Sequence, residues 1–212
     1  MMTEEEFERI FNDVYMSIFG TGLFSKLMCD EIEKRNLKYE DLKILEVGCG
    51  CGKLGYFVAT KGADYQGFDI DRKQIFYAEL IREIADYVTR RRIGDVYYYE
   101  DNIFEVQEGY GTNYYDVVFN EGFLEHFDNK IQEKILKIMM ELSKNLVMIF
   151  VPDKDNPIAM KRAQETTHNY KGMPEKEYPL SRDELKILME KAGLKNVEIK
   201  PCNEMIFGVG EK

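Results

Sequence analysis

Segments with strand and helix character alternate from Lys43 onward, and this alternation constrains the fold more than any other feature. Strands are expected at 43–47, 65–69, 95–99, 115–120 and 145–151, and helices between them at 53–60, 72–91 and 128–143. Successive strands joined through helices run parallel, because a parallel connection needs a crossover. The nearly continuous apolar runs "KILEV" and "NLVMIFV" indicate strands covered by helices on both faces.

The C-terminal part changes this pattern. A helix is expected from about Arg182 to Ala192, with Ser181 as its N-cap and Gly193 at its end. Two short strands follow, joined by a turn at 201–203, and a tight turn makes two strands antiparallel. The predicted fold is therefore α/β: a Rossmann-like, seven-stranded, mostly parallel sheet with an antiparallel C-terminal hairpin and helices on both faces.

The length of 212 residues and a hydrophobic content of 44 % fit a single domain. Within it, residues 1–40 carry apolar positions at helical spacing and predict two N-terminal helices that cap the active site, ahead of a core at 41–212. The proline-containing segment 152–180 lies inside this core. An irregular segment of that length in a compact domain favours a substrate-binding insert or lid.

Charge and hydropathy limit the partners of the chain. A net charge of −10 argues against nucleic acid, because binding to a phosphate backbone relies on clustered Lys and Arg. The acidic start "MMTEEEFERI" does not resemble a secretory signal, and the longest apolar run, Leu146 to Val151, is too short to cross a bilayer. We therefore expect a cytoplasmic protein without a membrane segment.

The stretch "KILEVGCGCGKLG" places four glycines behind the first strand, and two interpretations compete for it. Gly50-x-Gly52-x-x-Gly55 matches the dinucleotide fingerprint, with Asp69 placed to bind a ribose. In that fold, however, the first glycine of the triplet follows the strand directly, whereas here the triplet begins a step later. The pattern that fits the strand end is Glu46-x-Gly48-x-Gly50-x-Gly52.

An acid at the end of strand one followed by alternate glycines resembles the first motif of class I S-adenosylmethionine-dependent methyltransferases. Later segments resemble further motifs of that family in the same order: "YQGFDID", "YYYEDNIFE", "YDVVFNEGFLEHF" and "LSRDELKILMEKAGLKNVEI". The resemblance covers most of 41–212. It implies an enzyme that binds S-adenosyl-L-methionine and releases S-adenosyl-L-homocysteine.

The same resemblance implies roles for individual residues. Asp69 would accept both ribose hydroxyls, Ile70 would flank the adenine, and Asp101 and Asn102 would contact its exocyclic amine through an acceptor side chain and a free backbone N–H. An acidic neighbourhood favours the ammonium group of the methionine part. The cofactor-binding residues implied are Glu46, Gly48, Gly50, Gly52, Asp69, Ile70, Asp101, Asn102 and Asn120. Asp71 is equally well explained as the N-cap of the following helix.

The expected reaction is in-line displacement of the activated methyl group, which needs a base only if the acceptor arrives protonated. His126, just beyond strand four, is the candidate general base, although a packing or capping role explains it equally well; His168 in the 152–180 insert is a weaker candidate. Glu121 and Glu125 lie one residue too far apart for the Glu-x-x-Glu-His metal motif of some family members. We therefore predict no metal.

The acceptor is expected to be a small molecule, with a protein substrate as a further possibility. The chain reads "NEGF" where methyltransferases of DNA bases and glutamine side chains carry Asp/Asn-Pro-Pro-Tyr/Phe. Two alternatives stay open at this stage: a catalytically inactive S-adenosylmethionine-binding module, and an NAD(P)-dependent oxidoreductase. The second would need a hydride-transfer site such as Tyr-x-x-x-Lys, and the pair Tyr170 and Lys171 does not have that spacing.

Overall fold

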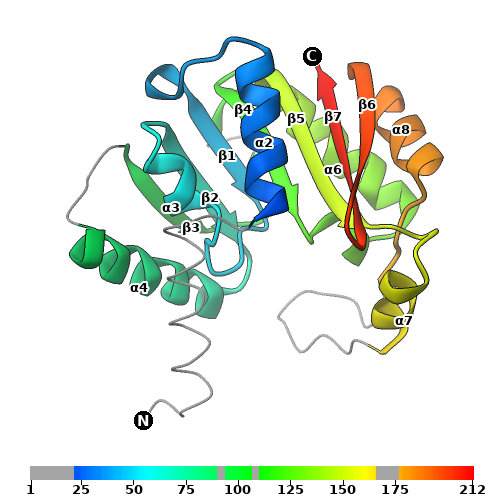
Figure 1. Ribbon diagram of the computed structural model, residues 1–212, viewed down its shortest axis with the longest axis horizontal. Coiled ribbons are helices and arrows are strands. Elements are labelled where there is room, and N and C mark those ends of the chain that lie inside the picture. The colour runs from blue at the N-terminus through cyan, green and yellow to red at the C-terminus, as the bar shows by residue number, and fades with distance from the viewer. Residues whose placement is uncertain (1–21, 90–93, 107–109, 166–176) are drawn as a thin grey trace. The chain divides into compact units, whose positions relative to one another are not determined.

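The computed structural model describes residues 22–89, 94–106, 110–165 and 177–212 (Figure 1). Two compact units make up the chain, one ending at Glu100 and the other beginning at Asp101. The first of the two expected N-terminal helices and His168 lie outside the described residues. The second helix is present as α2, which begins directly after Gly22.

The first unit contains three parallel strands. Its elements are α2 (Leu23–Lys34), η1 (Tyr39–Asp41), β1 (Lys43–Val47), α3 (Gly55–Ala59), β2 (Asp64–Asp69), α4 (Arg72–Thr89) and β3 (Val96–Glu100). β2 pairs in parallel with β1 on one side and with β3 on the other. α3 packs on β2, and α4 packs on β2 and β3. The carboxyl ends of parallel strands meet at one edge, so the loop after β1 and the end of β2 are neighbours.

The second unit contains the remaining four strands. Its elements are β4 (Tyr115–Glu121), η2 (Leu124–His126), α6 (Asn129–Leu142), β5 (Ser143–Pro152), α7 (Pro157–Glu165), α8 (Arg182–Lys191), β6 (Lys195–Cys202) and β7 (Met205–Glu211). β4 and β5 are parallel, whereas β7 is antiparallel to both β5 and β6. α6 packs on β4 and β5, and α8 packs on β6 and β7.

The strands form a seven-stranded mixed sheet in the order β3-β2-β1-β4-β5-β7-β6. Only β7 runs against the others, as expected from the tight C-terminal turn. This confirms the Rossmann-like α/β fold that the alternation of segments predicts.

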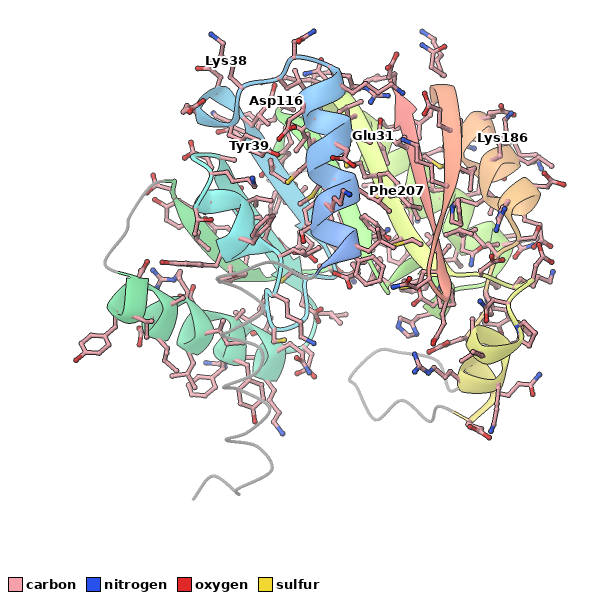
Figure 2. All side chains as sticks on the ribbon, viewed as in Figure 1. Glu31, Lys38, Tyr39, Asp116, Lys186 and Phe207 are labelled. Carbon is pink, nitrogen blue, oxygen red and sulfur yellow. The ribbon has the colours of Figure 1, made fainter. Side chains whose placement is uncertain are left out.

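The antiparallel end of the sheet has a well-packed core. The rings of Phe150 on β5 and Phe207 on β7, the latter labelled in Figure 2, are both fully buried and stack with centroids 4.5 Å apart. A Cβ on Gly208 would lie 2.7 Å from Met189 Sδ and 3.0 Å from Leu185 Cδ2. The glycine therefore lets α8 lie close against β7.

The hairpin turn lies further along the chain than expected. Pro201 and Cys202 belong to β6 and pair with Ile206 and Met205, so the turn is Asn203 and Glu204. Proline is tolerated there because β6 is an edge strand of the sheet. Asn203 supplies the left-handed backbone, with φ of 57°.

The segment 152–180 is less irregular than its prolines suggest. It contains the helix α7, which begins at Pro157. The Oδ1 atom of Asn156 accepts hydrogen bonds from the N–H groups of Ile158 and Ala159, and so caps this helix. Proline fits the first helical position because its missing N–H would have no helical partner there.

The helix expected at 53–60 is shorter than the sequence predicts. It is present only over Gly55–Ala59.

Candidate functional site

The glycine loop after β1 uses left-handed backbone at three alternate positions. Gly48, Gly50 and Gly52 have φ of 67°, 51° and 72°, where residues with a side chain are disfavoured. The N–H of Cys49 donates to Phe68 O at 2.9 Å, and the N–H of Gly52 donates to Cys49 O at 2.8 Å. The loop therefore continues the ladder with β2 and then turns tightly.

Asp69, at the end of β2, is bonded to this loop. One carboxylate oxygen accepts from the N–H of Gly50 at 2.9 Å, and the other accepts from the N–H of Asp71 at 2.9 Å. Burial raises the pKa of Asp69 above its usual value, while the backbone N–H groups oppose this shift. A carboxylate has about four acceptor lone pairs, so these two bonds leave capacity for a diol.

Glu46 is buried in β1, and its carboxyl group has a hydrogen-bonding partner. The hydroxyl of Tyr65, on β2, donates to Glu46 Oε2 at 2.5 Å. Burial raises the pKa of Tyr65 well above its usual value, and the nearby Glu46 raises it further. The hydroxyl therefore stays protonated and remains a donor at physiological pH.

Tyr98 supports the other end of the loop. Its hydroxyl donates to Gly52 O at 3.1 Å. A Cβ on Gly52 would lie 2.4 Å from the Tyr98 hydroxyl, and a Cβ on Gly55 would lie 2.3 Å from the Tyr65 ring. Neither tyrosine was expected in the site from the sequence. The sequence carried no signal for them, because their contacts depend on the register of three strands.

The residues that follow β2 have separate roles. Ile70 is 36 % exposed, and its contact with an adenine stays a prediction. Asp71 Oδ1 accepts from the N–H of Lys73 at 2.9 Å, and Asp71 O accepts from Gln74 at the same distance. These bonds are those of a helix N-cap, so the structure supports the capping role of Asp71.

Asp101 and Asn102 follow β3 directly in the chain, and their polar groups bond locally. Asp101 Oδ1 accepts from the N–H of Asn102 at 2.8 Å, so this N–H is not free, contrary to the expectation. Asn102 Oδ1 accepts from the N–H of Phe104 at 3.1 Å, and Asn102 O accepts from Glu105. Asn102 thus caps the turn that follows it. Its role toward a cofactor stays a prediction.

Asn120 lies in β4 with no exposed surface. Its Nδ2 atom contacts Met139 Sδ at 3.4 Å, so the side chain points toward α6. Its Oδ1 atom has no hydrogen-bond partner within the described residues. A cofactor contact of Asn120 therefore also stays a prediction.

The candidate base His126 lies in η2. Its Nε2 atom is 3.1 Å from Gly122 O. In a neutral ring, a proton on Nε2 would make this contact a hydrogen bond and would leave the lone pair on Nδ1, which is buried. The side chain is buried, which also fits a packing role.

Glu125, beside His126, is a buried acid. Its Oε2 atom has no hydrogen-bond partner in the described parts of the chain. Burial, together with the nearby acids Glu177 and Glu121, raises the pKa of Glu125 to about 8. The backbone around it is anchored, because the N–H of Tyr178 donates to Glu125 O at 2.5 Å.

No group of three His, Cys, Asp or Glu side chains able to hold a metal ion occurs among the described residues. Likewise, no helix in the described ranges is long and apolar enough to span a membrane. The absence of a metal and a cytoplasmic location stay predictions from the sequence.

A surface pocket in the first unit is lined by α3, α4 and the start of β3. It contains none of the expected site residues.

The sequence matches a known protein family. The profile of a family described as "Methyltransferase domain" matches residues 22–199, which is most of the chain. No curated protein sequence matches the chain.

Solved structures with a similar fold include magnesium protoporphyrin IX methyltransferase from Synechocystis PCC 6803 with bound SAH. It has 14% sequence identity and a TM-score of 0.65, covering 94% of this chain and 92% of that one. A SAM-dependent methyltransferase from Methanosarcina mazei has 19% identity and a TM-score of 0.67, covering 85% and 96%. One from Archaeoglobus fulgidus has 15% identity and a TM-score of 0.63, covering 93% and 97%. At these identities the likeness establishes the fold.

Proposed function

Because the chain belongs to the class I S-adenosylmethionine-dependent methyltransferase family, we propose that it transfers the methyl group of S-adenosyl-L-methionine to a small-molecule acceptor. The family membership favours the methyltransferase interpretation of the glycine loop over the dinucleotide one. The donor supplies an already activated sulfonium methyl group. The protein then has to bind the donor and the acceptor, orient them for in-line transfer, and exclude water.

The observation that carries this proposal is the hydrogen bond from the Gly50 N–H to Asp69, at 2.9 Å. It fixes the glycine loop to the carboxylate that would accept the ribose hydroxyls. Apart from its chain neighbours, no atom of the described residues lies within 4 Å of the position that a Cβ of Gly50 would take, so the backbone is open to close approach there. Glu46 adds the negative charge that suits the ammonium group of the methionine part. The residues present therefore fit the donor.

The proposed acceptor class rests on charge and on a structural neighbour. The net charge of −10 disfavours nucleic acid. The Synechocystis neighbour is named for the small molecule that it methylates, magnesium protoporphyrin IX. Within the second unit, His126 is the proposed base for a hydroxyl or amine acceptor, although its Nδ1 atom is buried.

The end of the 152–180 segment supports its proposed role in acceptor binding. The N–H of Tyr178 donates to Glu125 O, and the Nε2 atom of Gln132 donates to Tyr178 O at 3.2 Å and to Leu124 O at 3.3 Å. These bonds attach the segment to η2, which carries His126. An acceptor-binding segment attached in this way is held beside the candidate base.

Thermal unfolding tests the donor site. S-adenosylmethionine, S-adenosylhomocysteine, NAD and NADP are added separately, and a ligand that binds only the native state raises the melting temperature. We expect a shift with the two sulfur nucleosides alone, equivalent to about 2.7 kcal/mol when the ligand is at 100 times its Kd. A shift with NAD, or none with either sulfur nucleoside, contradicts the proposal.

A matched pair of variants locates the site. Asp69→Asn keeps one acceptor oxygen, so either the Gly50 or the Asp71 N–H loses its partner. We expect this variant to lose about tenfold or more in affinity for S-adenosylhomocysteine, measured by calorimetry. Asp64→Asn makes the same change at the exposed opposite end of β2 and is expected to bind like the wild type.

A further inference from the structure

Tyr65 and Tyr98 lie directly beneath the glycine loop, and neither is among the residues expected to contact the donor. Both are buried, with ring centroids 5.7 Å apart and ring planes at 63°. Their hydroxyls donate to the two ends of the motif: Tyr65 to Glu46 Oε2 and Tyr98 to Gly52 O. The pair thus contacts both the acid and the last alternate glycine of the loop.

The strand register explains how these groups meet. Glu46 of β1 is aligned with Gly67 of β2, and Gly67 is aligned with Tyr98 of β3. Aligned residues of parallel strands point to the same face, and so do residues two apart in one strand, which adds Tyr65 to the row. A Cβ on Gly67 would lie 2.5 Å from the Tyr65 hydroxyl, so a glycine there leaves room for that hydroxyl.

These contacts involve hydrogen bonds as well as packing. Burial raises the pKa of both hydroxyls well above the usual value, so both remain donors. A hydrogen bond to a charged acceptor is stronger than one between neutral groups, and it fixes the side-chain rotamer of the acceptor. Phenylalanine would fill the same space without either bond.

We propose that Tyr65 and Tyr98 are positioning residues for the methyl donor. Tyr65 holds the Glu46 carboxylate in the position in which it binds the ammonium group of the donor's methionine part, and Tyr98 holds the loop at Gly52. This inference rests on the proposed function and adds the residues that shape its donor site.

The test compares two ligands that differ only in the methionine part. S-adenosylhomocysteine carries the ammonium group, whereas 5′-methylthioadenosine keeps the nucleoside and sulfur without it. Both dissociation constants are measured by calorimetry for the wild type and Tyr65→Phe. We expect Tyr65→Phe to weaken S-adenosylhomocysteine about tenfold and to leave 5′-methylthioadenosine within twofold of the wild type.

Three further variants complete the design. Tyr98→Phe is expected to weaken both ligands, because the loop contacts the whole donor. Tyr97→Phe is the matched control: it removes a hydroxyl from the adjacent residue of β3, whose side chain is 46 % exposed, and should change neither constant. If Tyr65→Phe does not fold, Glu46→Gln removes the charge, leaves an acceptor for the Tyr65 hydroxyl, and should show the same selective loss.

The outcomes separate this inference from the proposed function. A wild-type protein that does not bind S-adenosylhomocysteine overturns the proposed function itself. Wild-type binding together with wild-type affinities in Tyr65→Phe overturns only the positioning role of Tyr65. Equal weakening of both ligands in Tyr65→Phe or Glu46→Gln also overturns it, because a general loosening of the loop would then explain the loss.

Discussion

Glu125 makes the stability of the protein depend on pH, because its carboxyl group is buried and Oε2 has no hydrogen-bond partner among the described residues. Burial raises its pKa from the ordinary 4.5 to about 8. Between these values the folded state binds more protons than the unfolded state, so the contribution of Glu125 to stability falls as pH rises through this window. Above pH 8 the folded state must hold a buried charge.

Glu125→Gln removes this ionisation and keeps the shape of the side chain. We expect Glu125→Gln to have a higher free energy of unfolding than the wild type at pH 8.5, by a few kcal/mol at most, and a similar value near pH 5. Urea unfolding at a series of pH values measures both. Glu105→Gln, at an exposed position, serves as control. Equal pH profiles for Glu125→Gln and the wild type would show that Glu125 ionises normally.

Some residues of the site could be predicted from the sequence, and others could not. The positions of Glu46, Gly50 and Asp69 follow from the ends of two strands, which the apolar pattern locates well. The contacts of Tyr65 and Tyr98 depend on the register of three strands, and register is a tertiary property. The N–H of Asn102 bonds to its neighbour Asp101 because short acidic side chains compete for nearby backbone groups.

The helix α8 illustrates an element whose ends are encoded locally. The hydroxyl of Ser181 accepts from the N–H of Glu184 at 3.2 Å, and the Glu184 carboxylate accepts from the N–H of Ser181 at 2.8 Å. This reciprocal capping box is visible in the sequence, so the start of α8 is predicted correctly. The helix α7 differs from the expected irregular segment, because proline at its first position is compatible with a helix start.

Removing the cap of α8 should therefore weaken the whole second unit, because α8 packs against β6 and β7. We expect Ser181→Ala to lower the free energy of unfolding by about 1 kcal/mol, since it leaves the Glu184 N–H without its acceptor. Ser181→Thr retains a hydroxyl and should lose much less. Urea unfolding monitored by circular dichroism measures both variants, and equal losses would argue against the cap as the cause.

For the molecule as a whole, the sequence predicts fold and family better than it predicts the acceptor. Crossover connections and the C-terminal turn restrict the sheet to few topologies, and the observed strand order agrees with them. Acceptor choice depends instead on side chains in loops, which have no periodic signal in the sequence. The role of the 152–180 segment in acceptor binding stays a prediction. Even there, the attachment of Tyr178 to η2 appears only in three dimensions.

The net charge of −10 has a consequence for the stability of the entire chain. Several surface ion pairs, such as Lys137 with Glu133, join neighbours on one helix and contribute little. The excess negative charge repels itself in the compact state, and salt screens this repulsion, since the Debye length falls from about 30 Å at 0.01 M to about 8 Å at 0.15 M. We therefore expect the melting temperature to rise with NaCl over this range. Each kcal/mol gained corresponds to about 2–4 °C. A melting temperature that falls with added NaCl would mean that attractive pairs outweigh the net repulsion.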